Sequence, residues 1–198
     1  MKHVAAGFSD HSGWAVMAVV RQEAGGPFEL DWRARIQTCP PNLPRQPFHA
    51  VAEQGFDQEV IAEVYGAAVG LGRRAIEVAR LESKGSLSAA AVAIGRLGRA
   101  DSRPETAATL KSHAMLHSAE GELYRDALTQ AAAEEGLRIV RFISKEVRSE
   151  AAAALGCSLA QLETRLDEIG KAAGRPWTKD EKDATAASML ALATVPSR

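Results

Sequence analysis

The segment from Leu87 to Ile94 restricts the fold of this chain more than any other part of the sequence. Its residues, LSAAAVAI, form a nearly continuous run of small and aliphatic side chains without polar alternation. A strand with this pattern is buried on both faces, as in parallel sheets that helices cover on each side. A helical crossover would make it parallel to another strand of the sheet. The run therefore predicts an α/β fold.

Three further strands are predicted before this segment. Apolar runs at residues 3–8 and 14–20 flank a cluster of turn-forming residues at 9–13, which indicates a β-hairpin. Residues 28–37 alternate between apolar and polar side chains, so this third strand should have one face in water.

Helical spacing dominates the rest of the chain. Apolar or small residues recur three and four positions apart over residues 57–82, which predicts a long amphipathic helix. Further helices are predicted from about 104 to 135 and over 145–155, 158–173 and 178–193, with a strand at 137–143. Thr178 is an expected N-cap, because Glu181 follows it by three residues as in a capping box. The resulting order is βββαβαβα.

Length and composition favour one globular domain over residues 1–198. Hydrophobic residues make up 46% of the chain and charged residues 25%, which is unlike the composition of disordered chains. Residues 38–56 are predicted to form a proline-rich loop within the domain, because four of the eight prolines lie between Cys39 and Pro47.

The charge and cysteine content exclude several classes of function. A net charge of -1 gives no global attraction to a polyanion, so any contact with nucleic acid must be local. Cys39 and Cys157 match neither a metal-ligand spacing nor a disulfide pattern, which favours a reducing compartment. We find no apolar run of the roughly 18 residues needed to cross a membrane and no signal peptide. The expectation is a cytoplasmic protein without membrane contact.

Four segments resemble, in order, those of the RuvC Holliday-junction resolvases. They are GFSDHSGWAVMAVVRQ near the N-terminus, AVAIGRLGRADSRPETAATLKSHA around the fourth strand, ALTQAAAEEGLRIVRFISKEVRSEAAAALG, and DEKDATAASMLALA in the last helix. The resemblance implies an RNase H-like fold, with a mixed five-stranded sheet of three antiparallel strands followed by parallel strands, flanked by helices. It also implies a homodimer that acts on structured DNA.

The chemistry implied by this resemblance is phosphodiester hydrolysis with two divalent cations, Mg²⁺ or Mn²⁺, held by converging carboxylates. Asp180 and Asp183 match the acidic pair of the family's last helix. Three residues apart on the first helical turn, they lie on one face and can share a metal. The alternative is that acidic residues favour helix N-termini because of the helix dipole.

The first strand departs from the family pattern. Aligned on the preceding glycine and phenylalanine, Ser9 stands where an aspartate is expected, and Asp10 follows it. Strand side chains alternate in direction, so a shift of one residue could turn Asp10 away from the metal. Alternatively, a short turn begins earlier and Asp10 takes the role. We keep Asp10 with Asp180 and Asp183 as the predicted catalytic and metal-binding set.

The fourth strand departs more clearly, because Gly95 stands where the family has a catalytic glutamate. Glycine has no side chain that could bind a metal. Glu120, Glu122 and Glu146 are candidates to replace it, and their alternative role is a solvated helix surface.

Three arginines follow the fourth strand, where a substrate-facing loop is expected: Arg96, Arg99 and Arg103. Arginine binds phosphate through two parallel hydrogen bonds, which makes these residues the candidate nucleic-acid contact. The alternative is a solvated loop.

His113 and His117 are four residues apart, so both imidazoles lie on one helical face, as in two-histidine metal sites. The sequence contains no HExxH motif and names no third ligand. We interpret the pair as the polar lining of a groove or as ordinary surface.

Two functional hypotheses follow. The first is a divergent metal-dependent nuclease that cleaves structured DNA. The second is a catalytically inactive relative that binds nucleic acid or a protein partner, because Gly95 replaces the glutamate. An actin-like ATPase is set aside, because 198 residues leave no room for two duplicated lobes.

Overall fold

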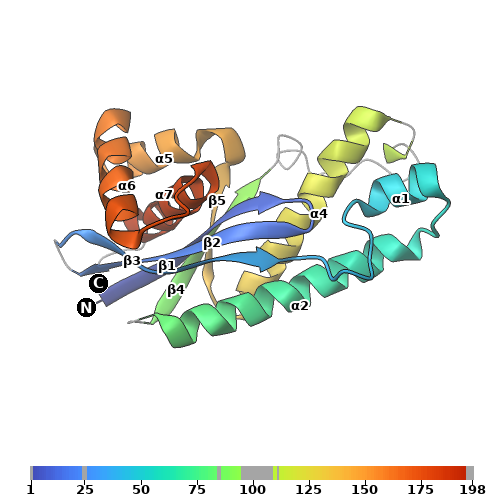
Figure 1. Cartoon of the computed structure of the whole chain (residues 1–198), viewed down its shortest axis with the longest axis horizontal. Helices are drawn as coiled ribbons and strands as arrows, with labels where there is room; N and C mark the ends of the chain where they lie inside the picture. The colour runs from blue at the N-terminus through green and yellow to red at the C-terminus, as the bar shows by residue number, and fades with distance from the viewer. Residues whose placement is uncertain (1, 24–25, 84–85, 95–108, 111, 195–198) are drawn as a thin grey trace.

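The computed structural model describes residues 2–23, 26–83, 86–94, 109–110 and 112–194 (Figure 1). The elements are β1 (Lys2–His11), β2 (Trp14–Glu23), β3 (Phe28–Gln37), α1 (Pro47–Gln54), α2 (Glu59–Glu82), β4 (Leu87–Ile94), α4 (His113–Glu134), β5 (Arg138–Ile143), the 3-10 helix η2 (Ser144–Glu146), α5 (Val147–Ala154), α6 (Leu159–Ala173) and α7 (Lys179–Ala193).

The strands form one mixed sheet in the order β3-β2-β1-β4-β5. β1 pairs with β2 and β2 with β3 in antiparallel fashion, whereas β1 pairs with β4 and β4 with β5 in parallel. The predicted α/β fold with a mixed five-stranded sheet is therefore confirmed. β1 and β4 are parallel neighbours, so their carboxyl ends meet at the same edge of the sheet.

Helices cover both faces of the sheet, as the buried run in β4 requires. α2 and α4 contact each other and pack on one face, while α5, α6 and α7 cover the other (Figure 1). The middle of β4, from Ala89 to Ala93, is almost completely buried, at 0–2% exposure. Its small side chains let both helical layers approach the sheet closely.

The first hairpin is longer than the sequence predicts. β1 continues to His11, which pairs with Trp14, so the turn contains only Ser12 and Gly13. Gly13 has φ 84°, in the left-handed region that glycine adopts without strain. Two residues expected in the turn, Ser9 and Asp10, are therefore strand residues whose side chains leave the sheet on opposite faces.

The predicted loop over residues 38–56 is confirmed for residues 38–46 and 55–56 but is wrong between them. Residues 47–54 form helix α1, which was not predicted, with Pro47 in its first turn. Proline is tolerated there because its missing N–H would have no helical partner in any case. Gly55, with φ 74°, ends the helix in the left-handed conformation.

Two predicted helices also differ in detail. The helix expected over 145–155 begins as the 3-10 turn η2 before α5. The one expected from about residue 104 is described as helix α4 from His113, and residues 95–108 lie outside the described part. Among the described helices, we find none long and apolar enough to cross a membrane.

Candidate functional site at the carboxyl end of β1

Helix α7 lies directly on β1 because Gly7 has no side chain. A β-carbon at Gly7 would lie 2.1 Å from the carbonyl oxygen of Ala184 and 2.3 Å from the amide nitrogen of Ser188. The Ser188 hydroxyl also donates to the Ala5 carbonyl over 2.6 Å and accepts from the Val20 amide over 3.1 Å. These contacts fix the position of α7 against the sheet.

The first turn of α7 is held by the predicted capping box. The Thr178 hydroxyl accepts from the Asp180 amide over 3.2 Å, and a Glu181 carboxylate oxygen accepts from the Thr178 amide over 2.7 Å. The capped turn carries Asp180 to the carboxyl end of β1, with Asp183 one turn further along the helix. The helix dipole favours negative charge at this end.

Asp180 contacts two residues at the end of β1. The Ser9 hydroxyl donates to Asp180 Oδ1 over 3.1 Å, and His11 Nε2 lies 3.0 Å from the same oxygen. The His11 ring stacks on Trp14, with ring centroids 3.9 Å apart and planes within 8° of parallel. The histidine is therefore held beside the carboxylate.

Asp183 is bonded to two cationic side chains. Arg148 Nε donates to Asp183 Oδ1 over 2.7 Å, and the Lys179 ammonium contacts Oδ2. Arg148 also binds Glu163, over 2.9 Å, so it is held by two carboxylates. The Lys179 side chain is 77% exposed and can leave the carboxylate at little energetic expense.

A cavity of about 90 Å³ lies between these groups. Its lining comes from the ends of β1, β4 and β5, from η2 and from the beginnings of α5 and α7: Phe8, Ser9, Asp10, His11, Ala93, Phe142, Ser144, Val147, Lys179, Asp180 and Asp183. The structure thus brings Asp180 and Asp183 together at the carboxyl ends of parallel strands, the usual place for ligand sites in α/β sheets.

The carboxylate of Asp10 does not join this pair. It accepts a hydrogen bond from Arg125 Nε on α4 over 2.9 Å, on the sheet face opposite α7. The Asp10 side chain is 5% exposed. Burial raises its pKa above the ordinary value, and the nearby Arg125 guanidinium opposes that rise. Metal binding by Asp10 stays a prediction, and its geometry in this structure matches the alternative in which the side chain turns away.

Two solved structures are similar to this arrangement of elements. The Thermus thermophilus RuvC structure matches with a TM-score of 0.56 and 14% identity, covering 94% of this chain and 92% of that one. T. thermophilus RuvC in complex with a Holliday junction substrate matches with a TM-score of 0.54 and 15% identity, covering 95% and 91%. The chain has a RuvC-like fold. Neither a protein-family model nor a curated protein sequence shows a significant match.

Within this RuvC-like fold, the glutamates considered as replacements have other contacts. Glu120 binds His49 on the opposite face of the sheet. Glu122 lies 3.8 Å from Arg125, and Glu146 ends the 3-10 helix η2. Gly95 and the three candidate DNA-binding arginines, Arg96, Arg99 and Arg103, lie outside the described residues.

Sequence reasoning missed two functional candidates, His11 and Arg148. A signal existed for His11, since it stands immediately before the turn of the first hairpin. Because the sequence predicted a turn over residues 9–13, His11 was not assigned to the strand, and its position beside Asp180 was not expected. Arg148 is separated from Asp183 by 35 residues, and only the packing of α5 against α7 brings the two together.

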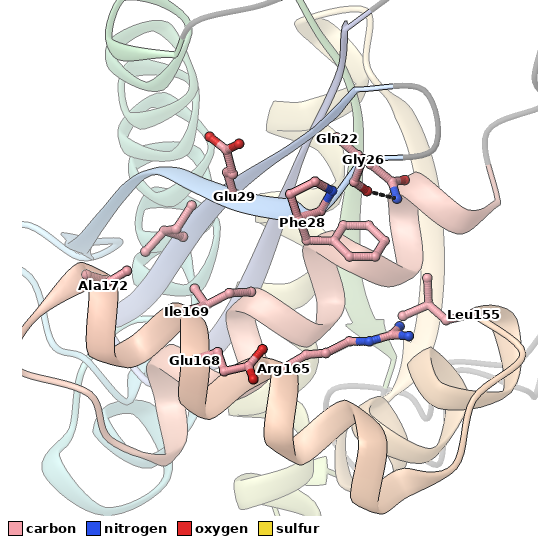
Figure 2. A pocket seen from close by; sticks show the side chains of 12 residues that line it. Gln22, Gly26, Phe28, Glu29, Leu155, Arg165, Glu168, Ile169 and Ala172 are labelled. Atoms are coloured by element: carbon pink, nitrogen blue, oxygen red, sulfur yellow. Dashed lines mark hydrogen bonds between the residues drawn. The ribbon is translucent and has the colours of Figure 1, made fainter.

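A larger hollow of about 940 Å³ lies elsewhere in the RuvC-like fold, between the β2–β3 hairpin and α6 (Figure 2). Phe28 and Ile169 supply apolar lining, Arg165 and Glu168 add charge, and Gln22 donates to the Gly26 carbonyl over 3.1 Å. Gln22 pairs with His3 at the start of β1. The hollow therefore lies toward the start of β1, whereas Asp180 lies at its carboxyl end. The hollow and the smaller cavity share no lining residue.

Proposed function

We propose that this protein is a metal-dependent nuclease that cleaves phosphodiester bonds in structured DNA. The observation that carries the proposal is the placement of Asp180 and Asp183. In a RuvC-like fold, they meet the end of β1 in one cavity at the carboxyl edge of the parallel strands.

The donor atoms at this place fit one hard divalent cation. Mg²⁺ is commonly bound through one or two carboxylates, with water and substrate phosphate completing its coordination. Asp180 and Asp183 supply the carboxylates, and the Ser9 hydroxyl lies beside Asp180. Ser9 and Gly95 replace two of the acids that a two-metal site would use, so we propose a single Mg²⁺ or Mn²⁺.

The bound ion would supply charge compensation for a phosphoryl oxygen. His11 is fixed beside Asp180 by stacking on Trp14, and its Nε2–H donates to the Asp180 carboxylate, which can only accept. The other ring nitrogen, Nδ1, then carries the lone pair that would accept a proton from an attacking water. Arg148 places positive charge beside Asp183 and would stabilise negative charge that develops on the phosphate.

Structured DNA is proposed as the substrate because one of the similar RuvC structures is a complex with a Holliday junction. The net charge of -1 requires a local basic contact, and Arg96, Arg99 and Arg103 are the proposed residues. A two-fold symmetric junction would suit a homodimer, which we also propose.

A second candidate function is DNA binding without cleavage. The observation that favours it is that both oxygens of Asp183 are already bonded to cations, Arg148 and Lys179. A carboxylate neutralised in this way stabilises the packing of α5 on α7 without any metal.

One experiment separates the two functions. Labelled four-way junctions, flaps, duplexes and RNA–DNA hybrids are incubated with the protein in Mn²⁺, Mg²⁺ or EDTA, and both cleavage and binding are measured. We expect metal-dependent cleavage that falls at least about 100-fold in Asp180→Asn and Asp183→Asn. The matched control is Asp57→Asn, an exposed aspartate, which should cleave like the wild type.

Binding without cleavage by the wild type would establish the second function. Neither binding nor cleavage of any of these nucleic acids would contradict both.

A further inference from the structure

Three histidines from two helices meet on the face of the sheet opposite Asp180. His49 comes from α1, and His113 and His117 from the first turns of α4. Their ligating nitrogens all lie within 4.8 Å of one another. The Nε2 atoms of His113 and His117 are 3.1 Å apart. The fold thus supplies the third ligand that sequence spacing alone did not identify.

The hydrogen bonds of His49 fix which of its nitrogens carries the proton. Glu120 Oε1 accepts from the His49 amide over 3.1 Å and lies 3.2 Å from His49 Nδ1. Since this oxygen already acts as an acceptor, Nδ1 is assigned as the protonated donor. The other ring nitrogen, Nε2, then carries a lone pair that can bind a metal.

That lone pair has no partner in the described part of the chain. The His49 side chain is 7% exposed, and its Nε2 is buried without a hydrogen bond among the described residues. Buried polar atoms are almost always paired, because an unpaired one loses its bonds to water without replacement. An unpartnered imidazole nitrogen beside two further imidazoles is therefore typical of a metal-binding site.

Glu120 gives a second indication. Its side chain is 1% exposed, and its second oxygen, Oε2, is buried without a partner among the described residues. A cation bound to His49 would place compensating positive charge close to this carboxylate.

We propose that His49, His113 and His117 bind a Zn²⁺ ion, with Glu120 orienting His49 through its Nδ1–H. Nitrogen donors suit zinc, and a carboxylate behind a zinc-bound histidine is a recurrent arrangement. Ligands about 2.0–2.1 Å from a tetrahedral zinc lie about 3.3 Å apart, close to the separation already present between His113 and His117.

The rings need to move only slightly to complete this geometry. His113 is 69% exposed and its Nδ1 lies 3.6 Å from Glu53 on α1, an exposed contact that is easily given up. His117 is also exposed, so both rings can rotate toward the buried His49. Three protein ligands leave a fourth coordination position open to water. The ion would join α1, which follows the proline-rich segment, to the start of α4.

The test uses full-length, tag-free protein stripped with EDTA and then dialysed. Zn²⁺ is titrated in competition with a chromophoric chelator, and Co²⁺ serves as a spectroscopic probe of tetrahedral coordination. We expect one tight Zn²⁺ per chain. Removing a ligand in His113→Ala or His117→Ala should weaken binding by more than the roughly 10–100-fold expected for the outer-shell change Glu120→Gln.

Two controls define the site. His3→Ala removes a histidine on β1 that is outside the cluster and should leave Zn²⁺ binding unchanged. Asp180→Asn/Asp183→Asn should also retain the ion, so failure of the nuclease proposal and failure of this one are distinguishable.

Unchanged affinity in both His113→Ala and His117→Ala would overturn the proposal, as would a folded wild type that binds no Zn²⁺ tightly. The two exposed histidines keep the test valid even if the buried Glu120→Gln variant fails to fold.

Discussion

The Ser9 hydroxyl donates to Asp180 Oδ1 over 3.1 Å, which joins the last part of β1 to the first turn of α7. A hydrogen bond from an uncharged hydroxyl to a carboxylate thus stands where the resemblance to resolvases implies a metal shared by two carboxylates. The contact shows that residue 9, and not residue 10, is the strand position that faces the acidic pair.

Ser9→Asp is therefore predicted to create metal-dependent stability. Without metal, the new carboxylate faces Asp180 and the two repel each other, so the melting temperature in EDTA should fall by about 2–4 °C for each kcal/mol of repulsion. Mn²⁺ should reverse the loss. Thermal melts in EDTA and in Mn²⁺ measure both effects, with Ser9→Asn as the uncharged control. A variant equally stable in the two conditions would show that the cavity holds no cation.

His11→Ala is predicted to lower the proposed cleavage rate by about 100-fold or more, because it removes the proton acceptor beside Asp180. Single-turnover kinetics on a junction substrate measure the rate, and a binding assay measures affinity separately. A loss of affinity with an unchanged single-turnover rate would assign His11 to DNA contact and contradict the proton-transfer role.

Gly7→Ala is predicted to destabilise the protein by at least about 1–3 kcal/mol, because its β-carbon would collide with the backbone of α7. The matched control is Gly70→Ala in α2, where a β-carbon meets nothing within 4 Å. That change should stabilise the helix by about 0.5–1 kcal/mol. Urea unfolding of both variants gives the comparison, and two effects of the same sign would refute the close approach of α7.

Arg125→Met is predicted to reduce the free energy of unfolding by about 3 kcal/mol, because it leaves the buried Asp10 carboxylate unpaired. Adding Asp10→Asn should recover much of this loss. A double-mutant cycle from urea unfolding at neutral pH measures the coupling. Additive effects of the two changes would mean that Asp10 and Arg125 do not interact.

Glu135 predicts a pH dependence of stability. Hydrogen bonding from Arg73, assisted by Arg80, lowers its pKa below the ordinary 4.5. The folded state therefore prefers the ionised form, and the resulting stability is present above about pH 4.5 and is lost as the pH falls through the lowered pKa. Glu135→Gln should abolish this component, on the order of 1 kcal/mol, in unfolding at neutral and acidic pH. Glu134→Gln, at a more exposed neighbouring position, is the control and should change the profile less.

The sheet could be predicted from the sequence because each strand carries its own signal. The buried run at 87–94 indicated a strand covered on both faces, and the alternation at 28–37 indicated one beside it. The acidic pair was also predictable, since Asp180 and Asp183 follow a capping box and their spacing fixes a common helical face. Each of these signals involves only residues close together in the sequence, so it can be recognised from the sequence alone.

The rest depends on tertiary contacts that spacing does not encode. The direction of Ser9 and Asp10 depends on where the first hairpin turns, and turn residues at 9–13 gave no reason to extend the strand to His11. Likewise, His49 lies beside His113 only because α1 packs against α4. The prolines around α1 had led to the prediction of a loop in its place. Residues far apart in sequence become neighbours through packing that a single sequence leaves open.

The alternation of Ser9 and Asp10 across the sheet has a consequence for how the protein would respond to mixtures of metals. The carboxylates of Asp180 and Asp183 lie on the side of Ser9, with the single imidazole of His11, whereas the three-histidine cluster that includes His49 lies on the side of Asp10. Hard ions prefer carboxylate oxygens and borderline ions prefer imidazole nitrogens. In a solution that contains both ions, Mn²⁺ should therefore bind at Asp180 and Asp183, and Zn²⁺ should bind at the three-histidine cluster on the other side of the sheet.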